Sequence, residues 1–300
     1  MKVFYNEKQT ARGNDSFSPS AQKPAKALAE WKRLHGDKIQ VVESGPVSSS
    51  DISLAHEHDY VKGVLSQVLP NGFGNTKPEV AESLPYTTGS FYAAAKHAAE
   101  TGEAAVSPTS GFHHACYHGG GGFCTFNGLM ITAIKLKKEG LVNRVGILDL
   151  DEHYGNGTDN IIDKLGIDYV SHYTGGAHGL TPAKSEQFLA DLPFILDEYF
   201  SDVDVLLYQA GADAHVNDPL GGYLDDDQLR RRDKIVFEWC KKNNKPVAWN
   251  LAGGYQVDRA TGSIQKVLNV HNATMDECLK AFEGISYDEN GEEKDYSSAV

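Results

Sequence analysis

The chain has 300 residues, of which 40% are hydrophobic and 23% are charged, and its formal net charge is −13. These proportions are typical of a globular protein of one or two domains. The acidic balance argues against a nucleic-acid partner, which needs a basic surface, and no apolar run is long enough to cross a bilayer.

Helical and strand patterns alternate along the chain. Helical patterns occur at residues 21–35, 88–102 and 227–244. Short apolar runs typical of buried strands occur at residues 103–108, 144–151, 204–213 and 246–255. Because the later runs are separated by segments long enough for crossover helices, we predict a parallel α/β sheet.

The N-terminal residues and the cysteines indicate the cellular compartment of the protein. The N-terminal residues lack the apolar core of a secretory signal, and the four cysteines show neither a disulfide framework nor a CxxC pair. We therefore expect free thiols and a cytoplasmic protein. Residues 286–300 are acidic and poor in apolar side chains, so we expect a flexible tail there.

Polar residues follow each of the four predicted strands. In chain order they are His113 and His114, Asp151 and His153, Asp213, and Tyr255. In open α/β sheets, ligands bind beyond the carboxyl ends of the strands. We therefore predict that these side chains converge in one site at that edge of the sheet.

The stretch DLDEHYGNGT, residues 149–158, has the spacing of a metal site. In an extended segment Asp149, Asp151 and His153 point to the same side. Zinc accepts oxygen and nitrogen ligands, and a catalytic zinc keeps three protein ligands, so Asp213 is a candidate third ligand. Alternatives are iron(II) at the same ligands, or loop residues that only bond to backbone amides.

Four ordered motifs resemble a known family. They are SGFHHA followed by GGFCTFNG, LDLDEHYGNGT, QAGADAH followed by DPLGGY, and NLAGGY, and the similarity spans roughly residues 18–271. Together they resemble the zinc-dependent histone deacetylases and acetylpolyamine amidohydrolases, which share an arginase-like α/β fold. The resemblance implies a single catalytic domain over residues 1–285, with helices on both faces of the sheet.

The resemblance also implies two ion sites. One catalytic Zn²⁺ would be held by Asp151, His153 and Asp213. A structural potassium or sodium ion would lie behind it, bound partly through backbone carbonyls, at Asp149, Asp151, His153, Ser171 and His172.

Catalytic roles follow from the same resemblance. His114 would take a proton from water and later give one to the leaving amine, while His113 would pair with Asp149 as an electrostatic partner. Tyr255 would donate its hydroxyl to the polarised carbonyl. Asn156 stands where many relatives have an aspartate, and because an amide stabilises a charged imidazole less than a carboxylate does, we expect a lower pKa for His114.

Substrate contacts are predicted around the glycines. Gly122 and Phe123 would form part of a narrow tunnel for the acyl-amine chain, and Gly253 would border the substrate near the catalytic tyrosine. In the family an arginine near the start of the domain is linked with acetate exit, and Lys26 is the nearest cation to its place. The rim lacks an obvious match to the aspartate that holds a peptide backbone in eukaryotic relatives.

We therefore predict a zinc-dependent amidohydrolase that removes acetyl, or a similar small acyl group, from lysine side chains. An acetylated polyamine is the alternative substrate, and the negative charges of exposed Glu79 and Glu82 could attract such a cation. Oligomers are compatible with the sequence. A two-manganese ureohydrolase is disfavoured because no second set of ligands is evident, and a silent binding module is disfavoured because the complete set of proposed catalytic residues is present.

Overall fold

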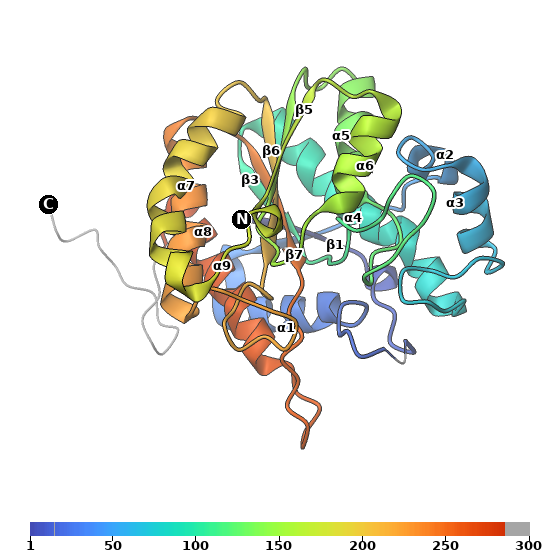
Figure 1. Cartoon of the computed structure of the whole chain (residues 1–300), viewed down its shortest axis with the longest axis horizontal. Helices are drawn as coiled ribbons and strands as arrows, with labels where there is room; N and C mark the ends of the chain where they lie inside the picture. Colours follow the sequence, from blue (N-terminus) through green and yellow to red (C-terminus); the bar gives the residue numbers. More distant parts are fainter. Residues whose placement is uncertain (15, 286–300) are drawn as a thin grey trace, which may run out of the picture.

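One parallel sheet forms the centre of the protein (Figure 1). The computed structural model describes residues 1–14 and 16–285, so the predicted tail at residues 286–300 lies outside the described residues. Within the described part, seven strands run in the order β2-β1-β3-β7-β6-β4-β5. Their bounds are β1 Lys2–Tyr5, β2 Gln40–Glu43, β3 Ala104–Ser107, β4 Val145–Asp149, β5 Val170–Thr174, β6 Val205–Gly211 and β7 Val247–Ala252.

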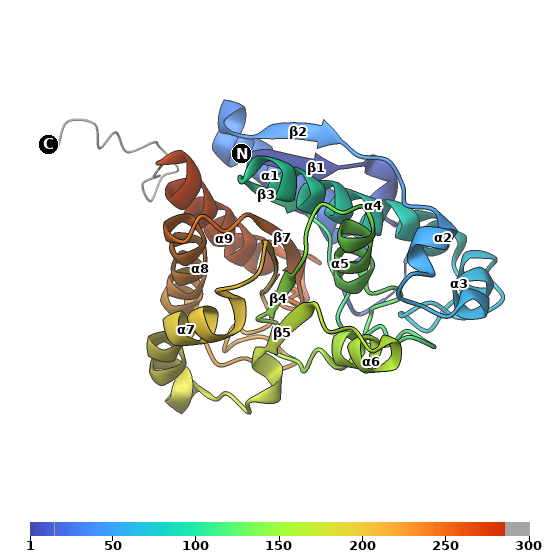
Figure 2. The ribbon, with the colours of Figure 1, turned by 90° about the horizontal axis from the view of Figure 1, so that it is seen from above.

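Helices cover both faces of this sheet. Figure 2 shows α7, α8 and α9 gathered on one side, with α4, α5 and α6 on the other. In the described residues the helices are α1 Lys23–His35, α2 Ser49–Ile52, α3 His58–Leu65, α4 Pro78–Thr101, α5 Gly128–Lys138, α6 Asn156–Leu165, α7 Ser185–Phe200, α8 Asp226–Lys242 and α9 Gln265–Glu283. Short 3₁₀ turns occur at Glu7–Gln9, Gly36–Lys38, Gly175–Ala177 and Pro182–Lys184. None of the described helices is long and apolar enough to span a membrane.

Local sequence explains where the predicted helices begin and end. The alanine-rich pattern is the second half of α4, which starts with Pro78 in its first turn and ends at Gly102 in the left-handed conformation, φ 76°. Helix α8 starts at a capping box in which the Asp225 side chain accepts from the backbone of Gln228, whose own side chain bonds back. All three predicted helices and all four predicted strands are therefore confirmed.

The core consists of two apolar layers, one on each face of the sheet. Successive strand residues point to opposite faces, so Val145 and Ile147 of β4 pack with α4, α5 and α6. Leu148 and Leu150 pack on the opposite face with α7, α8 and α9. Both layers confirm the predicted arrangement of a parallel sheet between two helical layers.

A row of buried polar residues crosses the sheet near its carboxyl end. The strand register aligns Ser107 of β3 with Asn250 of β7, then Gln209 of β6, and then Asp149 of β4. All four side chains are buried. Because β3, β7, β6 and β4 are neighbours in space, the loops that follow them meet above this row.

Candidate active site

Two acids and one histidine form a compact group beyond β4 and β6. Asp151 and Asp213 are buried, and His153 is partly exposed. One potential ligand atom from each residue lies within 4.8 Å of the other two. The His153 Nδ1 atom is 3.1 Å from Asp151 Oδ1 and 3.2 Å from Asp213 Oδ2. The structure thus brings together the three predicted zinc ligands, which come from two adjacent strands.

The electrostatics of this group suit a divalent cation. Burial, followed by the nearby charge of Asp151, raises the pKa of Asp213 to about 7. Hydrogen bonds to Asp151 and Asp213 raise the pKa of His153 to about 11. Two carboxylates facing each other away from water are costly unless a positive charge lies between them. Two carboxylates and one imidazole are an oxygen and nitrogen donor set that fits zinc or iron(II).

The two adjacent histidines have different partners. His113 is buried, and its Nδ1 atom donates to Asp149 Oδ2 at 2.7 Å. His114 Nδ1 donates to Asn156 Oδ1 at 2.7 Å. The two imidazole rings lie side by side, with centroids 4.0 Å apart. The predicted pairings of both histidines are therefore present in the structure.

These partners give the two imidazoles opposite pKa shifts. Burial lowers the pKa of His113, but the charges of Asp149 and Asp151 outweigh it and raise this pKa to about 9. Burial and the neighbouring charge of His113 lower the pKa of His114. His113 is therefore suited to carry a positive charge, and His114 to accept a proton.

Tyr255 reaches the group through a turn that requires glycine. Gly253 and Gly254 have φ values of 45° and 88°, which side-chain-bearing residues rarely adopt. A Cβ atom on Gly253 would lie 2.0 Å from the carboxyl carbon of Asp213. The Tyr255 backbone N–H donates to Asp218 Oδ2 at 2.7 Å. Burial raises the pKa of Tyr255 above its ordinary value, so its hydroxyl remains a proton donor.

Lys23, rather than Lys26, is the cation beside this turn. Lys23 is fully buried and its Nζ donates to the carbonyl oxygen of Gly253, whereas Lys26 is exposed to solvent. Burial lowers the pKa of Lys23 to about 8, although Asp213 and Asp151 act in the opposite direction. The two lysines are three residues apart at the start of α1, and only tertiary packing decides which one is buried. The sequence therefore gave no signal for Lys23.

The glycine-rich segment lies against His114. Gly122 has a φ of 54°, and a Cβ atom there would be 2.5 Å from His114 Cδ2. The Phe123 ring is 5.6 Å from the ring of Tyr255, between centroids. Tyr255 also stacks on Phe17, with centroids 6.0 Å apart and an interplanar angle of 10°. Gly122 and Phe123 thus lie beside His114 and Tyr255, and their role in a tunnel stays a prediction.

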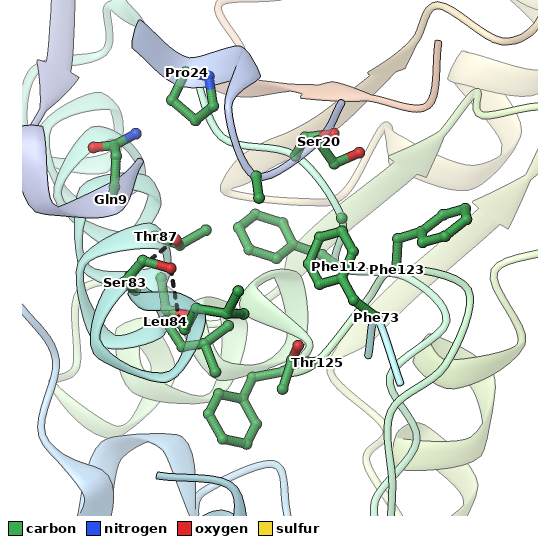
Figure 3. Close-up of a pocket in the computed structure, with 16 residues that line it drawn as sticks. Gln9, Ser20, Pro24, Phe73, Ser83, Leu84, Thr87, Phe112, Phe123 and Thr125 are labelled. Atoms are coloured by element: carbon green, nitrogen blue, oxygen red, sulfur yellow. Dashed lines mark hydrogen bonds between the residues drawn. The ribbon is translucent and has the colours of Figure 1, made fainter. Parts of the chain in front are cut away.

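Two small cavities lie behind this mouth. One, of about 10 Å³, is bordered by Asp151, Gly253 and Tyr255. The second, of about 30 Å³, lies between α4 and the segment before α1, with Phe112 and Phe123 in its wall (Figure 3). Ser20, Gly111 and Phe123 line both cavities. The inner space beside the metal-binding group is therefore small, with room for about one water-sized group.

Comparison with known proteins identifies the family. Residues 18–179 and 183–271 match the sequence pattern described as Histone deacetylase domain. The chain belongs to the histone deacetylase family. This assignment confirms the resemblance drawn from the four ordered motifs.

Relatives of this deacetylase-family protein span bacteria, archaea and plants. An uncharacterized protein of Picosynechococcus is 27% identical over 277 residues, covering 80% of this chain and 90% of that protein. Histone deacetylase 2 of Arabidopsis thaliana is 25% identical, covering 73% and 64% of the respective chains. A probable deacetylase of Methanothermobacter thermautotrophicus is 26% identical, covering 71% and 73%.

Solved structures show the same fold. The HDA15 HD domain superposes with a TM-score of 0.73 at 18% identity, covering 93% of this chain and 91% of that one. An acetylpolyamine aminohydrolase from Burkholderia pseudomallei gives a TM-score of 0.70 at 16% identity, covering 94% and 99%. At these identities the two structures establish the arginase-deacetylase-like fold of this family member.

The residues predicted for the monovalent cation are not all together in this deacetylase-family protein. His172 lies next to Asp149, since a Cβ atom on Gly155 would touch both side chains. Ser171, however, pairs with Gly146 in the β4–β5 register, three residues before Asp149. That offset corresponds to about 10 Å along a strand. Thr174 is the residue opposite Asp149.

Two exposed residues outside this group, His118 and Glu79, have structural partners of their own. Exposed His118 pairs with Glu57 at 3.0 Å. Glu79 accepts a hydrogen bond from the backbone of Gly13 at 2.6 Å, so it is already engaged away from the catalytic group. All four cysteines lie in the described part of the chain and are unpaired, as expected.

Sequence reasoning missed Gln209 and Asp218. Gln209 donates to Asp149 Oδ1 at 3.1 Å and thereby orients the acid behind His113. A glutamine inside the buried apolar strand VLLYQAG is the sequence signal for it. Asp218 fixes the Tyr255 backbone, and it begins the DPLGGY motif, to which no role had been assigned.

Proposed function

We propose that this protein is a zinc-dependent amidohydrolase that removes acetyl, or a similarly small acyl group, from lysine side chains. One observation carries the proposal. The Asp151, His153 and Asp213 group stands next to the His113–His114 pair and to Tyr255, at the ends of four neighbouring strands. Family membership supports hydrolysis of an acylated amine as the reaction.

The proposed metal ligands are Asp151, His153 and Asp213. A bound zinc ion supplies Lewis-acid polarisation of a carbonyl and lowers the pKa of water from near 16 to about 7. The ligands are held in place by the surrounding backbone: the His153 N–H donates to Asp151 Oδ1 at 2.9 Å, and the Glu152 N–H donates to Asp213 Oδ1 at 3.2 Å.

The histidines divide the work of proton transfer. Because Asn156 Oδ1 can only accept, His114 carries its proton on Nδ1 and keeps the lone pair of Nε2 free as a base. His114 would remove a proton from the attacking water and then give it to the leaving amine. His113, held by Asp149, would remain positively charged and stabilise negative charge that develops nearby.

Tyr255 would stabilise the oxygen of the amide carbonyl as it becomes negative. Its hydroxyl stays protonated because burial raises its pKa. The Gly253–Gly254 turn and the Asp218 contact fix the direction of the ring. A donor held in place before the reaction needs no reorganisation during it, which is why such donors contribute strongly to catalysis.

The substrate class is tested by a direct comparison. We would measure kcat/KM for an acetyl-lysine peptide and for an N-acetylated polyamine, each with and without a zinc chelator, since specificity is that ratio. We expect turnover of the peptide, its loss with the chelator, and its recovery on adding zinc. Asp213→Asn should be inactive. Turnover of the polyamine alone would reassign the substrate, and absence of turnover for every acylated amine would reject the proposal.

A further inference from the structure

We infer that a groove beside Tyr255 selects acyl-lysine peptides that carry an acidic residue next to the modified lysine. The inference rests on the proposed function, because it assigns the substrate class of the same site. Three features carry it: the groove opens at the catalytic tyrosine, its walls are partly apolar, and Arg259 in its lining makes no hydrogen bond or ion pair within the described residues.

The groove is continuous with the active site. It has a volume of about 950 Å³ and is bordered by Phe17, the loop after β7 and the start of α9. Tyr255 lines both this groove and the small inner cavity beside Asp151. A substrate whose amide reaches Tyr255 from outside would therefore leave its remaining atoms in or next to the groove.

The shape of the groove is set by an ordered loop. Asp258 Oδ1 accepts from the backbone N–H groups of Ala260 and Thr261, both at 2.9 Å, and from the Thr261 hydroxyl at 3.0 Å. The Asp258 N–H donates to Ser263 O at 2.8 Å, which closes the loop. Figure 1 shows this loop after β7 projecting from the molecule at the bottom of the view. Because the loop is already ordered, substrate binding does not include the free-energy cost of ordering it.

The walls of the groove offer apolar contacts at the catalytic end. Phe17 is 58% exposed although it stacks on Tyr255, and Val257 is 38% exposed. Exposed aromatic and aliphatic side chains beside a catalytic group are suited to contact a peptide. A fully hydrated polyamine chain offers fewer such contacts.

The charge of the groove distinguishes the two substrate classes. Arg259 and Lys266 both line it. Arg259 makes no hydrogen bond or ion pair to another residue of the described chain, whereas the charge of Lys266 acts on Asp258, whose pKa is lowered first by its hydrogen bonds with Thr261 and also by that charge. Asp258 is the single acid among the groove's described residues, and its Oδ1 atom is occupied by its own loop. The groove thus has two cations and one acid, in a protein whose formal net charge is −13.

This charge favours a carboxylate and disfavours a polycation. An arginine binds a carboxylate with two parallel hydrogen bonds, so Arg259 can recognise aspartate or glutamate specifically. A polyamine carries positive charges along its length, and Arg259 and Lys266 would repel them. Because the groove is open to solvent, we expect each added charge to change kcat/KM by about threefold, as for exposed ion pairs.

The test uses three acetyl-lysine peptides that differ at one flanking position, which is Asp, Asn or Lys. We would measure kcat/KM at low salt and, separately, binding of fluorescent versions by anisotropy. The wild type should rank Asp above Asn above Lys in both measurements. Arg259→Glu should reverse this order. Lys242→Glu makes the same change of charge at the last residue of α8. Because α8 leads into the amino end of β7, this position lies at the opposite edge of the sheet from the groove, and the variant should keep the wild-type order.

The two measurements separate the inference from the proposed function. An unchanged peptide order in Arg259→Glu, or tighter binding of an N-acetylated polyamine than of the Asp peptide, would overturn the inference even if hydrolysis is observed. Binding in the predicted order without hydrolysis of any peptide would support the groove and reject the catalytic proposal. Loss of the order at high salt in the wild type would support an ionic origin.

Discussion

At the scale of single residues, Gly253 shows how little space the metal-binding group leaves. A Cβ atom on Gly253 would overlap the Asp213 carboxylate, and the Gly253 carbonyl oxygen accepts a hydrogen bond from buried Lys23. The residue therefore connects the proposed zinc ligand, the buried cation and the turn that carries Tyr255. Adding one methyl group here should therefore weaken metal binding more than it lowers the stability of the fold.

We predict that Gly253→Ala weakens zinc binding at least tenfold, because the added Cβ would overlap the Asp213 carboxyl group. Affinity would be measured by competition with a chromophoric chelator. Gly262→Ala is the matched control: Gly262 also has a positive φ, 69°, but no atom lies within 4 Å of its Cβ position. The control should lose about 1 kcal/mol of stability and keep its zinc affinity. Equal zinc affinity of Gly253→Ala and wild type would contradict this packing argument.

For Tyr255 we predict a loss of rate without a loss of metal. Removing the hydroxyl in Tyr255→Phe should lower kcat by about 10²–10³-fold, the usual effect of deleting one oxyanion donor. Zinc content, measured by atomic emission, should stay at the wild-type level, because the ligands are Asp151, His153 and Asp213. If the variant turns over as fast as the wild type, Tyr255 has no part in the reaction.

At the scale of elements, His56 holds both ends of the glycine-rich segment. Its Nδ1 donates to the Cys116 carbonyl at 2.9 Å, and its Nε2 accepts from the Asn127 N–H at 2.8 Å. Asn127 in turn caps α5 by accepting from the Met130 N–H. These bonds require a neutral imidazole, because a charged ring would point a second N–H at the N–H of Asn127.

His56 therefore makes the fold sensitive to acid. Burial lowers the pKa of His56 to about 4, against 6.5 for the unfolded chain. Between these values the unfolded state binds a proton that the folded state does not, so stability falls as the pH falls. By pH 5 the protonation difference at His56 should lower the free energy of unfolding by about 2 kcal/mol. Urea unfolding at pH 7.5 and pH 5 should show a smaller acid loss in His56→Gln than in the wild type. Exposed His118→Gln is the control, and an unchanged acid loss in His56→Gln would contradict the prediction.

The sequence was most informative where an apolar run ends in a polar group. The runs that became β3, β4, β6 and β7 are fully buried, so their patterns were strong. Strands β2 and β5 lie at the edges of the sheet and are partly exposed, so their patterns were weak. The sequence also could not show which lysine of α1 turns inward, because that choice depends on packing against the turn after β7.

At the scale of the whole molecule, the two apolar layers stabilise the fold, and the buried carboxylates at the carboxyl edge of the sheet destabilise it. Asp149, Asp151 and Asp213 are all buried at that edge. A cation that binds only the folded state offsets this cost and stabilises the fold by mass action.

We therefore predict that metal removal lowers the melting temperature. At a free zinc concentration 100 times its Kd, the stabilisation is about 2.7 kcal/mol, which for a chain of this size corresponds to roughly 4 °C. Differential scanning calorimetry with and without a chelator would measure it. In Asp213→Asn the chelator should have little effect. A wild-type melting temperature that does not respond to zinc would argue against a metal site in this protein.

The most direct test of the central claim is a zinc titration of the metal-depleted protein, followed by acetate release from an acetyl-lysine peptide. The account predicts activity that rises from near zero and reaches a plateau at one zinc ion per chain, with no response in Asp151→Asn or Asp213→Asn. Full activity of the metal-depleted protein, or an equal response of those two variants, would contradict it.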